Sequence, residues 1–309
     1  MKKVFIDGSA GTTGLRIRGR LASRGDITLV TLPDAIRKDP SARRDALNSA
    51  DIAFLCLPDQ AAVEAVAMVE NGTTAVIDTS TAHRVAEGWE YGFPELTGRR
   101  ERIRSSRRIA NPGCHASGFI ALVAPLVERG AIVKDALLSC FSLTGYSGGG
   151  NKMIAEYEAP SRSPLLEAPR QYGLSQAHKH LPEMKTVCGL DAAPAFAPIV
   201  APFYSGMEVT VMLHRGQTGA TPDAIRDLYR DYYSGAALVH VADDGVGEGG
   251  FLSASAYADR DDMEICVSGN ADRILLVSRF DNLGKGASGA AIQNMNILLG
   301  VDEREGLVL

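Results

Sequence analysis

The sequence predicts an α/β protein with two domains, and three observations support that prediction. Its 309 residues suit two domains of ordinary size. Strand and helix signals alternate over roughly the first 80 residues, which predicts a parallel sheet covered on both faces. Longer β-type runs with one intervening helix follow, which predicts a mixed or antiparallel sheet. We therefore expect an α/β domain and an α+β domain that pack closely, because no Pro/Gly linker separates them.

Local signals set the elements of the first domain. A proline directly after Asp39 opens a helix, Pro58 ends the third strand, and Asn71-Gly72 stops the helix before the fourth strand. The expected strands cover residues 4–7, 27–31, 52–57 and 75–78. The expected helices cover residues 15–23, a short segment from residue 40, and 60–70.

Beyond residue 80 the pattern changes. Residues 81–108 are expected to be irregular, and the arginines of 99–108 to form a solvated face, before a short strand at 108–110. Thr221 is a suitable N-cap for a later helix. The expected helices are 119–128, 222–233 and 287–299, and the expected strands are 136–143, 195–200, 207–213, 263–267 and 274–280.

Composition and charge exclude several classes of protein. Apolar residues make up 45% and charged residues 22%, which is typical of a globular protein and excludes disorder over the whole chain. The net charge of −5 predicts no nucleic-acid binding. No apolar run approaches the ~20 residues that cross a bilayer, and the first residues resemble a strand rather than a signal peptide. Five cysteines without a CxxC pair predict a cytoplasmic protein.

A glycine-rich turn joins the first strand to the first helix. The glycines of Gly8-Ser9-Ala10-Gly11-Thr12-Thr13-Gly14 let the backbone approach a pyrophosphate, and free N–H groups at the helix start face the anion. The spacing is G-x-x-G-x-x-G rather than the commoner G-x-G-x-x-G. The strand–turn–helix context predicts a Rossmann-like dinucleotide-binding domain, with a plain tight turn as the alternative.

Charges after the second strand bear on the choice between NAD and NADP. An acidic residue there would hold a ribose 2′-hydroxyl, and a basic residue would hold a 2′-phosphate. Asp34 is present, but Arg37 and Lys38 follow at once. We therefore favour NADP, with a solvated loop as the alternative for the two cations.

Asn111-Pro112-Gly113-Cys114-His115 ends a strand and opens a helix. We expect Asn111 to cap this helix and Pro112 to take its first position, which puts Cys114 in the first turn. The positive end of the helix dipole favours the thiolate there. The alternative is a small buried cysteine.

A thiolate nucleophile needs an acid/base group, usually a histidine. We expect His115 to point elsewhere, because neighbours in a helix face different directions. His178 and His180 lie in an irregular segment that can bend back to the cysteine, and either of them could be the base. With no third ligand at suitable spacing, we expect no metal.

Two later glycine loops can also approach a ligand. Residues 145–152 follow a β-type run, and residues 282–289 precede the last helix. A flexible hairpin and close helix packing are the respective alternatives. Together with the thiolate and the histidines, a nicotinamide site predicts a narrow chemistry. The thiolate attacks an activated acyl group to give a thioester, hydride reduces it to a thiohemiacetal, and a histidine moves protons as this collapses to an aldehyde.

Motifs spread from residue 6 to residue 296 resemble one family. They are IDGSAGTTG, CLPD, DTSTAHR, YGFPEL, NPGCHASGF, GYSGGGNKM, QAHKHLPEM and NLGKGASGAAIQNMN. The chain resembles the N-acetyl-γ-glutamyl-phosphate reductases of arginine biosynthesis, in their shorter subfamily. The resemblance implies an NADP-dependent enzyme that reduces N-acetyl-γ-glutamyl phosphate to N-acetyl-L-glutamate 5-semialdehyde and phosphate. It also implies a homodimer or homotetramer and a fold of the semialdehyde dehydrogenase type. Residues 1–113 and 284–309 would bind NADP, and residues 114–283 would carry catalysis and oligomerisation.

The resemblance also assigns residues to roles. Cys114 matches the nucleophile, and His178 and His180 match the His-x-His element. The implied cofactor contacts are Gly8, Ser9, Ala10, Gly11, Thr12, Thr13, Gly14, Arg37, Lys38, Pro58, Asn282, Gly284, Lys285 and Gly286. The implied substrate contacts are Arg84, Asn111, Ser147, Gly148 and Gly149. Two stretches depart from the family pattern: residues 115–117, where an aromatic, a small residue and threonine are more usual, and residues 81–84.

Other functions compete with this one. A sister acyl-phosphate reductase, such as aspartate-semialdehyde dehydrogenase or an aminoadipate-type enzyme, would share the chemistry, although HKHLPE and GKGASGAAIQN argue against the aspartate enzyme. A catalytically inactive NADP-binding sensor would not need Cys114 with both histidines. A thiol hydrolase would leave the glycine turn without a role.

Overall fold

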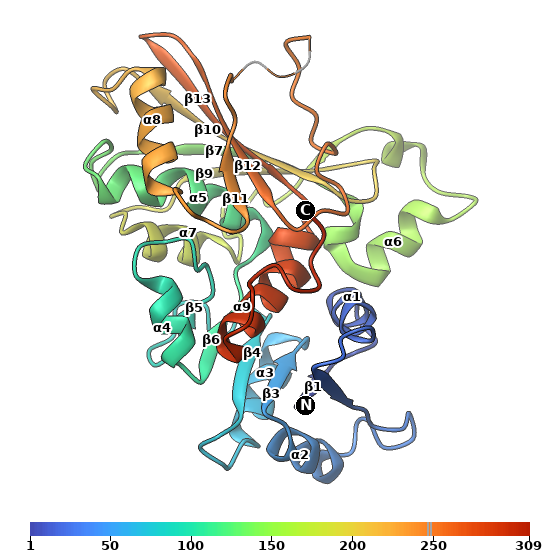
Figure 1. Ribbon diagram of the computed structural model, residues 1–309. Helices are drawn as coiled ribbons and strands as arrows, with labels where there is room; N and C mark the ends of the chain where they lie inside the picture. The colour runs from blue at the N-terminus through green and yellow to red at the C-terminus, as the bar shows by residue number, and fades with distance from the viewer. Residues whose placement is uncertain (246, 248) are drawn as a thin grey trace. The chain divides into compact units, whose positions relative to one another are not determined.

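The computed structural model describes residues 1–245, 247 and 249–309. The chain divides into two compact units (Figure 1). Unit 1 comprises residues 1–112 and 287–307, and unit 2 comprises residues 113–286 and 308–309.

Unit 1 is built on a parallel sheet of six described strands in the order β2-β1-β3-β4-β6-β5. The strands are β1 (Lys2–Asp7), β2 (Ile27–Val30), β3 (Ile52–Leu55), β4 (Ala75–Asp78), β5 (Glu90–Tyr91) and β6 (Arg108–Ala110). The helices are α1 (Thr12–Leu21), α2 (Pro40–Ser49), α3 (Asp59–Ala67), α4 (Arg99–Ser105) and α9 (Gly289–Leu299). The parallel sheet confirms the α/β prediction for this part of the chain.

Each face of this sheet buries its own apolar cluster. Val4 and Ile6 of β1 pack with Ile17 of α1 and Ile292 of α9 on one face. Phe5 lies on the opposite face with side chains from α2 and α3. Successive side chains of a strand point to opposite faces, so the continuously apolar strands reflect burial on both sides.

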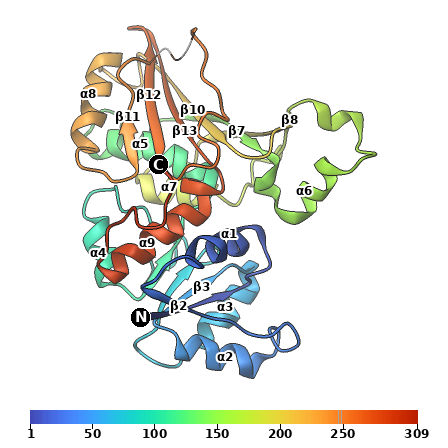
Figure 2. The same cartoon turned by 45° about the vertical axis from the view of Figure 1, so that its right-hand side comes forward.

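Unit 2 is built on a mixed sheet of seven described strands in the order β11-β12-β13-β10-β7-β9-β8 (Figure 2). The strands are β7 (Ser139–Gly145), β8 (Arg170–Gln171), β9 (Ala195–Ala201), β10 (Met207–His214), β11 (Val239–Val241), β12 (Met263–Gly269) and β13 (Arg273–Phe280). The β7–β9 and β11–β12 pairs are parallel, and the other pairs are antiparallel. The mixed sheet confirms the prediction for the second half of the chain.

Four α-helices accompany this sheet in the described part of unit 2. They are α5 (Cys114–Glu128), α6 (Gly150–Glu158), α7 (Leu181–Cys188) and α8 (Pro222–Tyr232). α5 is almost wholly buried and contacts α7, α8, β10 and β13. Thr221 caps α8 as predicted, because its side chain accepts a hydrogen bond from the Ala224 N–H. Short segments are the 3₁₀ helices η1 (Tyr146–Gly149) and η2 (Pro164–Glu167) and the π-helix η3 (Gly284–Ser288).

Several sequence-based boundaries are wrong. The stretch 81–108 is not irregular throughout, because β5 and α4 lie within it. α4 is short and polar, and Arg99 and Arg102 both pair with Glu90, so its arginines are not simply a solvated face. α1 begins at Thr12 rather than at residue 15. α6 and α7 were not predicted, since three successive glycines lead into the first turn of one and a proline stands in the first turn of the other.

Candidate active site

Cys114 is the first residue of α5, so its predicted place in the first turn of a helix is confirmed. The predicted cap is wrong: Gly113 is the N-cap residue, and Pro112 precedes it. The Asn111 amide instead donates to the Ala287 carbonyl within unit 1. The Gly113 N–H donates to the buried carboxylate of Glu183, at 3.1 Å. A side chain from α7 therefore satisfies this end of the backbone, and the helix start holds a partly exposed thiol.

A tight loop before α9 lies against the cysteine. A Cβ atom built on Gly286 would lie 2.9 Å from Cys114 Cβ, so a larger residue would displace one of the two segments. Asp281 holds this loop, because its carboxylate accepts from the N–H groups of Leu283 and Gly284 at 2.6 and 3.0 Å. Its carbonyl accepts from the Gly286 N–H. Sequence reasoning did not single out Asp281.

The structure brings the two predicted histidines together. The ring centroids of His178 and His180 are 4.8 Å apart, and the His180 N–H donates to His178 Nδ1 at 3.2 Å. His180 is buried, and its Nε2 lies 4.0 Å from a Glu183 oxygen. Glu183 thus contacts both the backbone before Cys114 and the environment of His180. It was missed as a site residue, although it lies in the motif HKHLPE.

His115, which we expected to point away from Cys114, lies in the same cluster as the two predicted histidines. Its ring centroid lies 5.7 Å from that of His178 and 5.5 Å from that of His180. Its two ring nitrogens lie 2.6 Å from Ser142 Oγ and 2.6 Å from the Tyr172 hydroxyl. Sequence reasoning missed this cluster, because its contacts join α5, β7 and the segment before α7, which are far apart in the chain.

The predicted substrate loop at residues 145–152 is helical from residue 146 onward rather than a flexible hairpin. Residues 146–149 form η1, and α6 follows directly. Ser147 is buried, and its hydroxyl accepts from the Asn282 amide at 3.0 Å, while Asn282 Oδ1 accepts from the Gly206 N–H. Gly148 lies beside this pair and Gly149 packs on Met153. In unit 2 the structure therefore joins Ser147 to Asn282. Gly284 and the buried Lys285 lie in η3.

In unit 1 the predicted glycine turn leads from β1 to α1. Gly8 has φ of +87°, and a Cβ atom there would lie 2.1 Å from the Cys56 carbonyl oxygen. Only glycine fits this position, because both the dihedral angle and the neighbouring backbone exclude a side chain. Gly11 is the N-cap residue of α1, with no side-chain cap. Ser9, Ala10, Thr12 and Thr13 complete the turn and open the helix, and Pro58 is the N-cap residue of α3.

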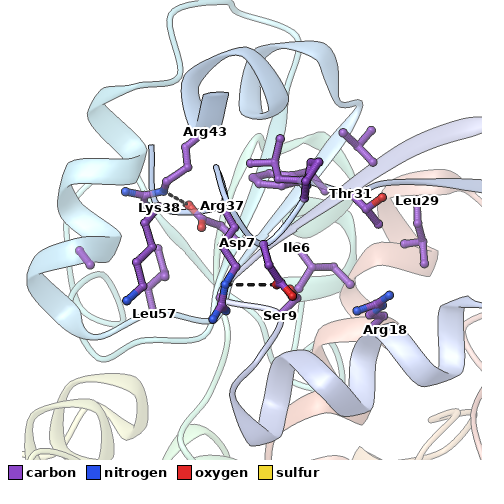
Figure 3. Close-up of a pocket in the computed structure, with 17 residues that line it drawn as sticks. Ile6, Asp7, Ser9, Arg18, Leu29, Thr31, Arg37, Lys38, Arg43 and Leu57 are labelled. Atoms are coloured by element: carbon purple, nitrogen blue, oxygen red, sulfur yellow. Dashed lines mark hydrogen bonds and ion pairs between the residues drawn. The ribbon is translucent and has the colours of Figure 1, made fainter. Parts of the chain in front are cut away.

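A cavity of about 540 Å³ opens beside this turn (Figure 3). Gly8 and Ser9 line it together with Arg37 and Lys38, so the structure unites the predicted turn with both predicted cations. Arg18 of α1 also lines it, and sequence reasoning missed that residue. Two ion pairs shape the walls: Asp7–Arg43 at 2.8 Å and Asp34–Arg37 at 3.4 Å.

The predicted substrate residues of unit 1 also meet. Arg84 Nε donates to the Asn111 carbonyl at 3.0 Å and Nη2 donates to the Thr79 carbonyl at 3.2 Å. The neighbouring His83 lies 2.6 Å from the buried carboxylate of Asp78 and stacks on Trp89.

In the described part of the chain no group of three or more His, Cys, Asp or Glu side chains is arranged to hold a metal ion. No described helix is long and apolar enough to cross a membrane.

Comparison with known proteins defines the class first. Residues 34–106 match the family described as semialdehyde dehydrogenase, NAD binding domain, and residues 114–282 match the semialdehyde dehydrogenase dimerisation domain. The fold is similar to that of aspartate semialdehyde dehydrogenase II from Vibrio cholerae, with a TM-score of 0.71, 15% identity and coverage of 97% of this chain and 98% of that one. The Candida albicans enzyme solved with NADP gives a TM-score of 0.69 at 17% identity, with coverage of 97% and 98%. The chain is thus a semialdehyde dehydrogenase with a nicotinamide dinucleotide-binding domain.

The relatives in sequence narrow this class. N-acetyl-gamma-glutamyl-phosphate reductase from Rhizobium meliloti is 46% identical over 305 residues, covering 96% of this chain and 98% of that protein. The protein of the same name from Chelativorans sp. is 45% identical over 307 residues, with coverage of 96% and 98%. N-acetyl-gamma-glutamyl-phosphate reductase 2 from Pseudomonas putida is 44% identical over 313 residues, with coverage of 98% of each. The chain belongs to this reductase family, which confirms the resemblance found in its motifs.

Proposed function

We propose that the protein reduces N-acetyl-γ-glutamyl phosphate to N-acetyl-L-glutamate 5-semialdehyde and phosphate, in arginine biosynthesis. The observation that supports this most directly is the thiol of Cys114 at the start of α5, where the next residue, His115, has ring contacts with both His178 and His180. That arrangement occurs in a chain about 45% identical to reductases of this name.

The residues of the chain divide the work of an acyl transfer. The thiolate of Cys114, favoured at a helix N-terminus, attacks the acyl carbon. The carbon–oxygen bond to phosphate breaks, phosphate leaves with the electron pair, and a thioester forms on the cysteine. A nicotinamide cofactor, when bound, supplies the hydride that takes the acyl group to the aldehyde level. The His178–His180 pair donates a proton to the oxygen that gains charge and takes it back as the carbon–sulfur bond breaks.

The cavity of unit 1 fits NADP. Its glycine turn can approach a pyrophosphate closely, and Arg18, Arg37 and Lys38 bring three cations to the same space. A 2′-phosphate carries charge that a ribose hydroxyl lacks, so this set of residues favours NADP over NAD. Asn282, Gly284, Lys285 and Gly286 stay predicted cofactor contacts. Arg84, Asn111, Ser147, Gly148 and Gly149 stay predicted substrate contacts.

We further propose that two copies of the chain associate through the open face of the unit 2 sheet. Phe141 and Leu275 are 46% and 40% exposed on that face. Their strands are both neighbours of β10, where Phe141 is opposite Thr210 and Leu275 is opposite Met212. Exposed apolar side chains on one face of a sheet are typical of an interface. A Phe141→Glu variant should shift the mass measured by light scattering toward the monomer. None of the five cysteines, all of which lie in the described part of the chain, forms a disulfide, which favours the cytoplasm as the location.

The reaction run backwards tests the proposed function. Purified protein receives N-acetyl-glutamate semialdehyde, phosphate and NADP⁺, and the absorbance of the reduced nicotinamide is followed. Formation of NADPH that requires phosphate is the expected result. A parallel reaction with aspartate semialdehyde tests the sister enzyme, and activity with that compound alone would overturn the proposed substrate. Silence with both compounds, while NADPH still binds, would support the sensor instead.

A further inference from the structure

The third histidine of the cluster has no part in the function proposed above. His115 is the second residue of α5 and is 3% exposed. Its ring nitrogens contact Ser142 Oγ and the Tyr172 hydroxyl, each at 2.6 Å. Burial, helped by the charges of His178 and Lys179, lowers the pKa of His115 to about 3. The ring is therefore neutral near pH 7, so one nitrogen donates a hydrogen bond and the other accepts one.

Ser142 decides which nitrogen carries the proton. This serine is fully buried on β7, and within the described residues its hydroxyl has one hydrogen-bond partner, His115 Nδ1. A buried hydroxyl proton without an acceptor costs about 1–3 kcal/mol. The hydroxyl therefore donates to Nδ1, and the ring proton is on Nε2. It follows that Nε2–H donates to the oxygen of Tyr172.

The consequence for Tyr172 is that its own hydroxyl proton is available to donate a hydrogen bond to a group other than His115. The phenol oxygen accepts from His115, so its O–H points to another group. Burial in the first place, and then the negative charge of Cys114, raises the pKa of Tyr172, so it keeps that proton. Its ring lies 5.8 Å from that of His178, and its backbone N–H donates to the Pro198 carbonyl. Tyr172 is thus a fixed, partly exposed donor that contacts His115 and His178 and lies within electrostatic reach of Cys114.

We propose that the Tyr172 hydroxyl donates a hydrogen bond to the oxygen of the acyl group held at Cys114, and that His115 is the positioning residue that aims it. This rests on the proposed function. The acyl oxygen gains negative charge when the thiolate adds to the carbon. A donor that is already oriented stabilises that charge without reorganising. Ser142 sets the direction of this chain of hydrogen bonds. Ser142 donates to His115, His115 donates to Tyr172, and Tyr172 donates to the acyl oxygen.

Conservative variants measure the two roles separately. Tyr172→Phe removes only the hydroxyl and should lower kcat by about 10- to 100-fold, since loss of one oriented donor has effects of that order or larger. KM for NADPH should not change. His115→Phe keeps an aromatic ring but cannot donate to Tyr172, so it should lower kcat in the same direction. The double variant should resemble Tyr172→Phe alone, because His115 acts through Tyr172. Multiplied losses in the double variant would overturn the positioning role.

A matched control separates this effect from the loss of any tyrosine hydroxyl in unit 2. Tyr232 of α8 donates to a Glu128 carboxylate oxygen at 2.7 Å, away from the histidine cluster. Tyr232→Phe should leave kcat unchanged. Melting temperatures of all variants show whether each is folded. If His115→Phe is not folded, ¹⁵N NMR of the wild-type histidines replaces it: a proton on Nε2 of His115 is expected, and a proton on Nδ1 would overturn the proposal.

Acylation of Cys114 by p-nitrophenyl acetate tests the donor without the natural substrate or the cofactor. The burst of p-nitrophenolate reports formation of the acetyl thioester, and its rate constant should fall about 10-fold in Tyr172→Phe. An unchanged burst would overturn the proposed donor. A further outcome is a burst that is slower in Tyr172→Phe than in the wild type, while the wild type does not turn over N-acetyl-glutamate semialdehyde. In that case the proposed function fails and the role of Tyr172 stands.

Discussion

The two candidate sites of this protein differ in the groups that form them and in how deeply those groups are buried. The site around Cys114 in unit 2 is held by buried hydrogen bonds, such as the one from the Gly113 N–H to Glu183 and the one between Ser142 and His115. The cavity of unit 1 consists of a backbone turn and long cations, of which Arg37 has a side chain that is 43% exposed.

This difference predicts how each site tolerates change. A buried network loses its geometry when one member is replaced, because the remaining polar groups stay buried without partners. Exposed cations share the attraction for a phosphate, so each contributes modestly and is screened by solvent. The glycine turn is the exception in unit 1, since its geometry depends on backbone contacts that a single added carbon would break.

Replacement of the thiol is the largest expected effect. Cys114→Ser should lower reduction by at least about 10³-fold, because a serine hydroxyl at a helix start is not ionised near pH 7. NADPH binding, measured by calorimetry, should not change. Loss of NADPH binding or retained turnover would contradict the role of Cys114.

Alkylation checks the same residue in the wild-type protein. Burial raises the pKa of each of the other four thiols, and that of Cys56 and Cys266 to about 12. Iodoacetamide near pH 7 should therefore label Cys114 first, and the labelling should disappear in Cys114→Ser.

Gly8→Ala should be the most damaging change in the cofactor turn. The new Cβ would overlap the Cys56 carbonyl oxygen, and the residue would keep a positive φ. We expect a loss of about 3 kcal/mol or more in the free energy of unfolding. Gly19→Ala is the control, because no atom lies within 4 Å of a Cβ there and the position is helical. Gly19→Ala should stabilise the protein by about 0.5–1 kcal/mol. Equal effects of the two variants on urea unfolding would contradict the packing argument.

Acid should destabilise the folded protein through His115, next to Cys114. The pKa of this histidine is about 3 in the folded protein against an ordinary value of 6.5, so the unfolded chain binds a proton first as the pH falls. The stabilisation is complete above pH 6.5 and is lost below it, at up to about 1.4 kcal/mol per pH unit. Between pH 6.5 and pH 4.5 the wild-type free energy of unfolding should fall by up to about 3 kcal/mol more than that of His115→Phe. Above pH 7 the two pH dependences should be parallel. Parallel pH dependences of the two proteins at acid pH would contradict the lowered pKa of His115.

The smallest expected effect concerns the exposed cations. Arg37→Ala combined with Lys38→Ala should weaken NADPH binding by about 5- to 30-fold, which corresponds to about 1–2 kcal/mol for charge-assisted contacts open to solvent. NADH binding should change by less than about twofold, because NADH has no 2′-phosphate. Arg44→Ala is a suitable control, since Arg44 is an exposed cation of α2 that pairs with Glu70 and does not line the cavity. An equal loss for NADPH and NADH would remove the basis for preferring NADP.

Much of the fold could be predicted because its signals are local. The apolar runs of β1, β3 and β4 locate the parallel strands. Thr221 marks the start of α8, because its side chain caps the N–H of Ala224, three residues further along the chain. The missed helices lacked such signals. α4 is rich in arginine and buries one apolar side chain, Ile103, while its arginines pair with Glu90 and Glu303, so it has no apolar stripe for a sequence pattern to detect. α6 follows glycines that equally suit a hairpin.

The amino-acid sequence by itself determined where a glycine turn meets a helix and where a cysteine meets a helix start, because both depend on contacts among neighbouring residues. Only the tertiary structure decided which side chains surround that cysteine. His115 reaches Ser142 across 27 residues and Tyr172 across 57, and neither partner has a signal in the sequence. A buried hydrogen bond depends on how the helix, the sheet and the segment before α7 pack, and local sequence patterns do not record that packing.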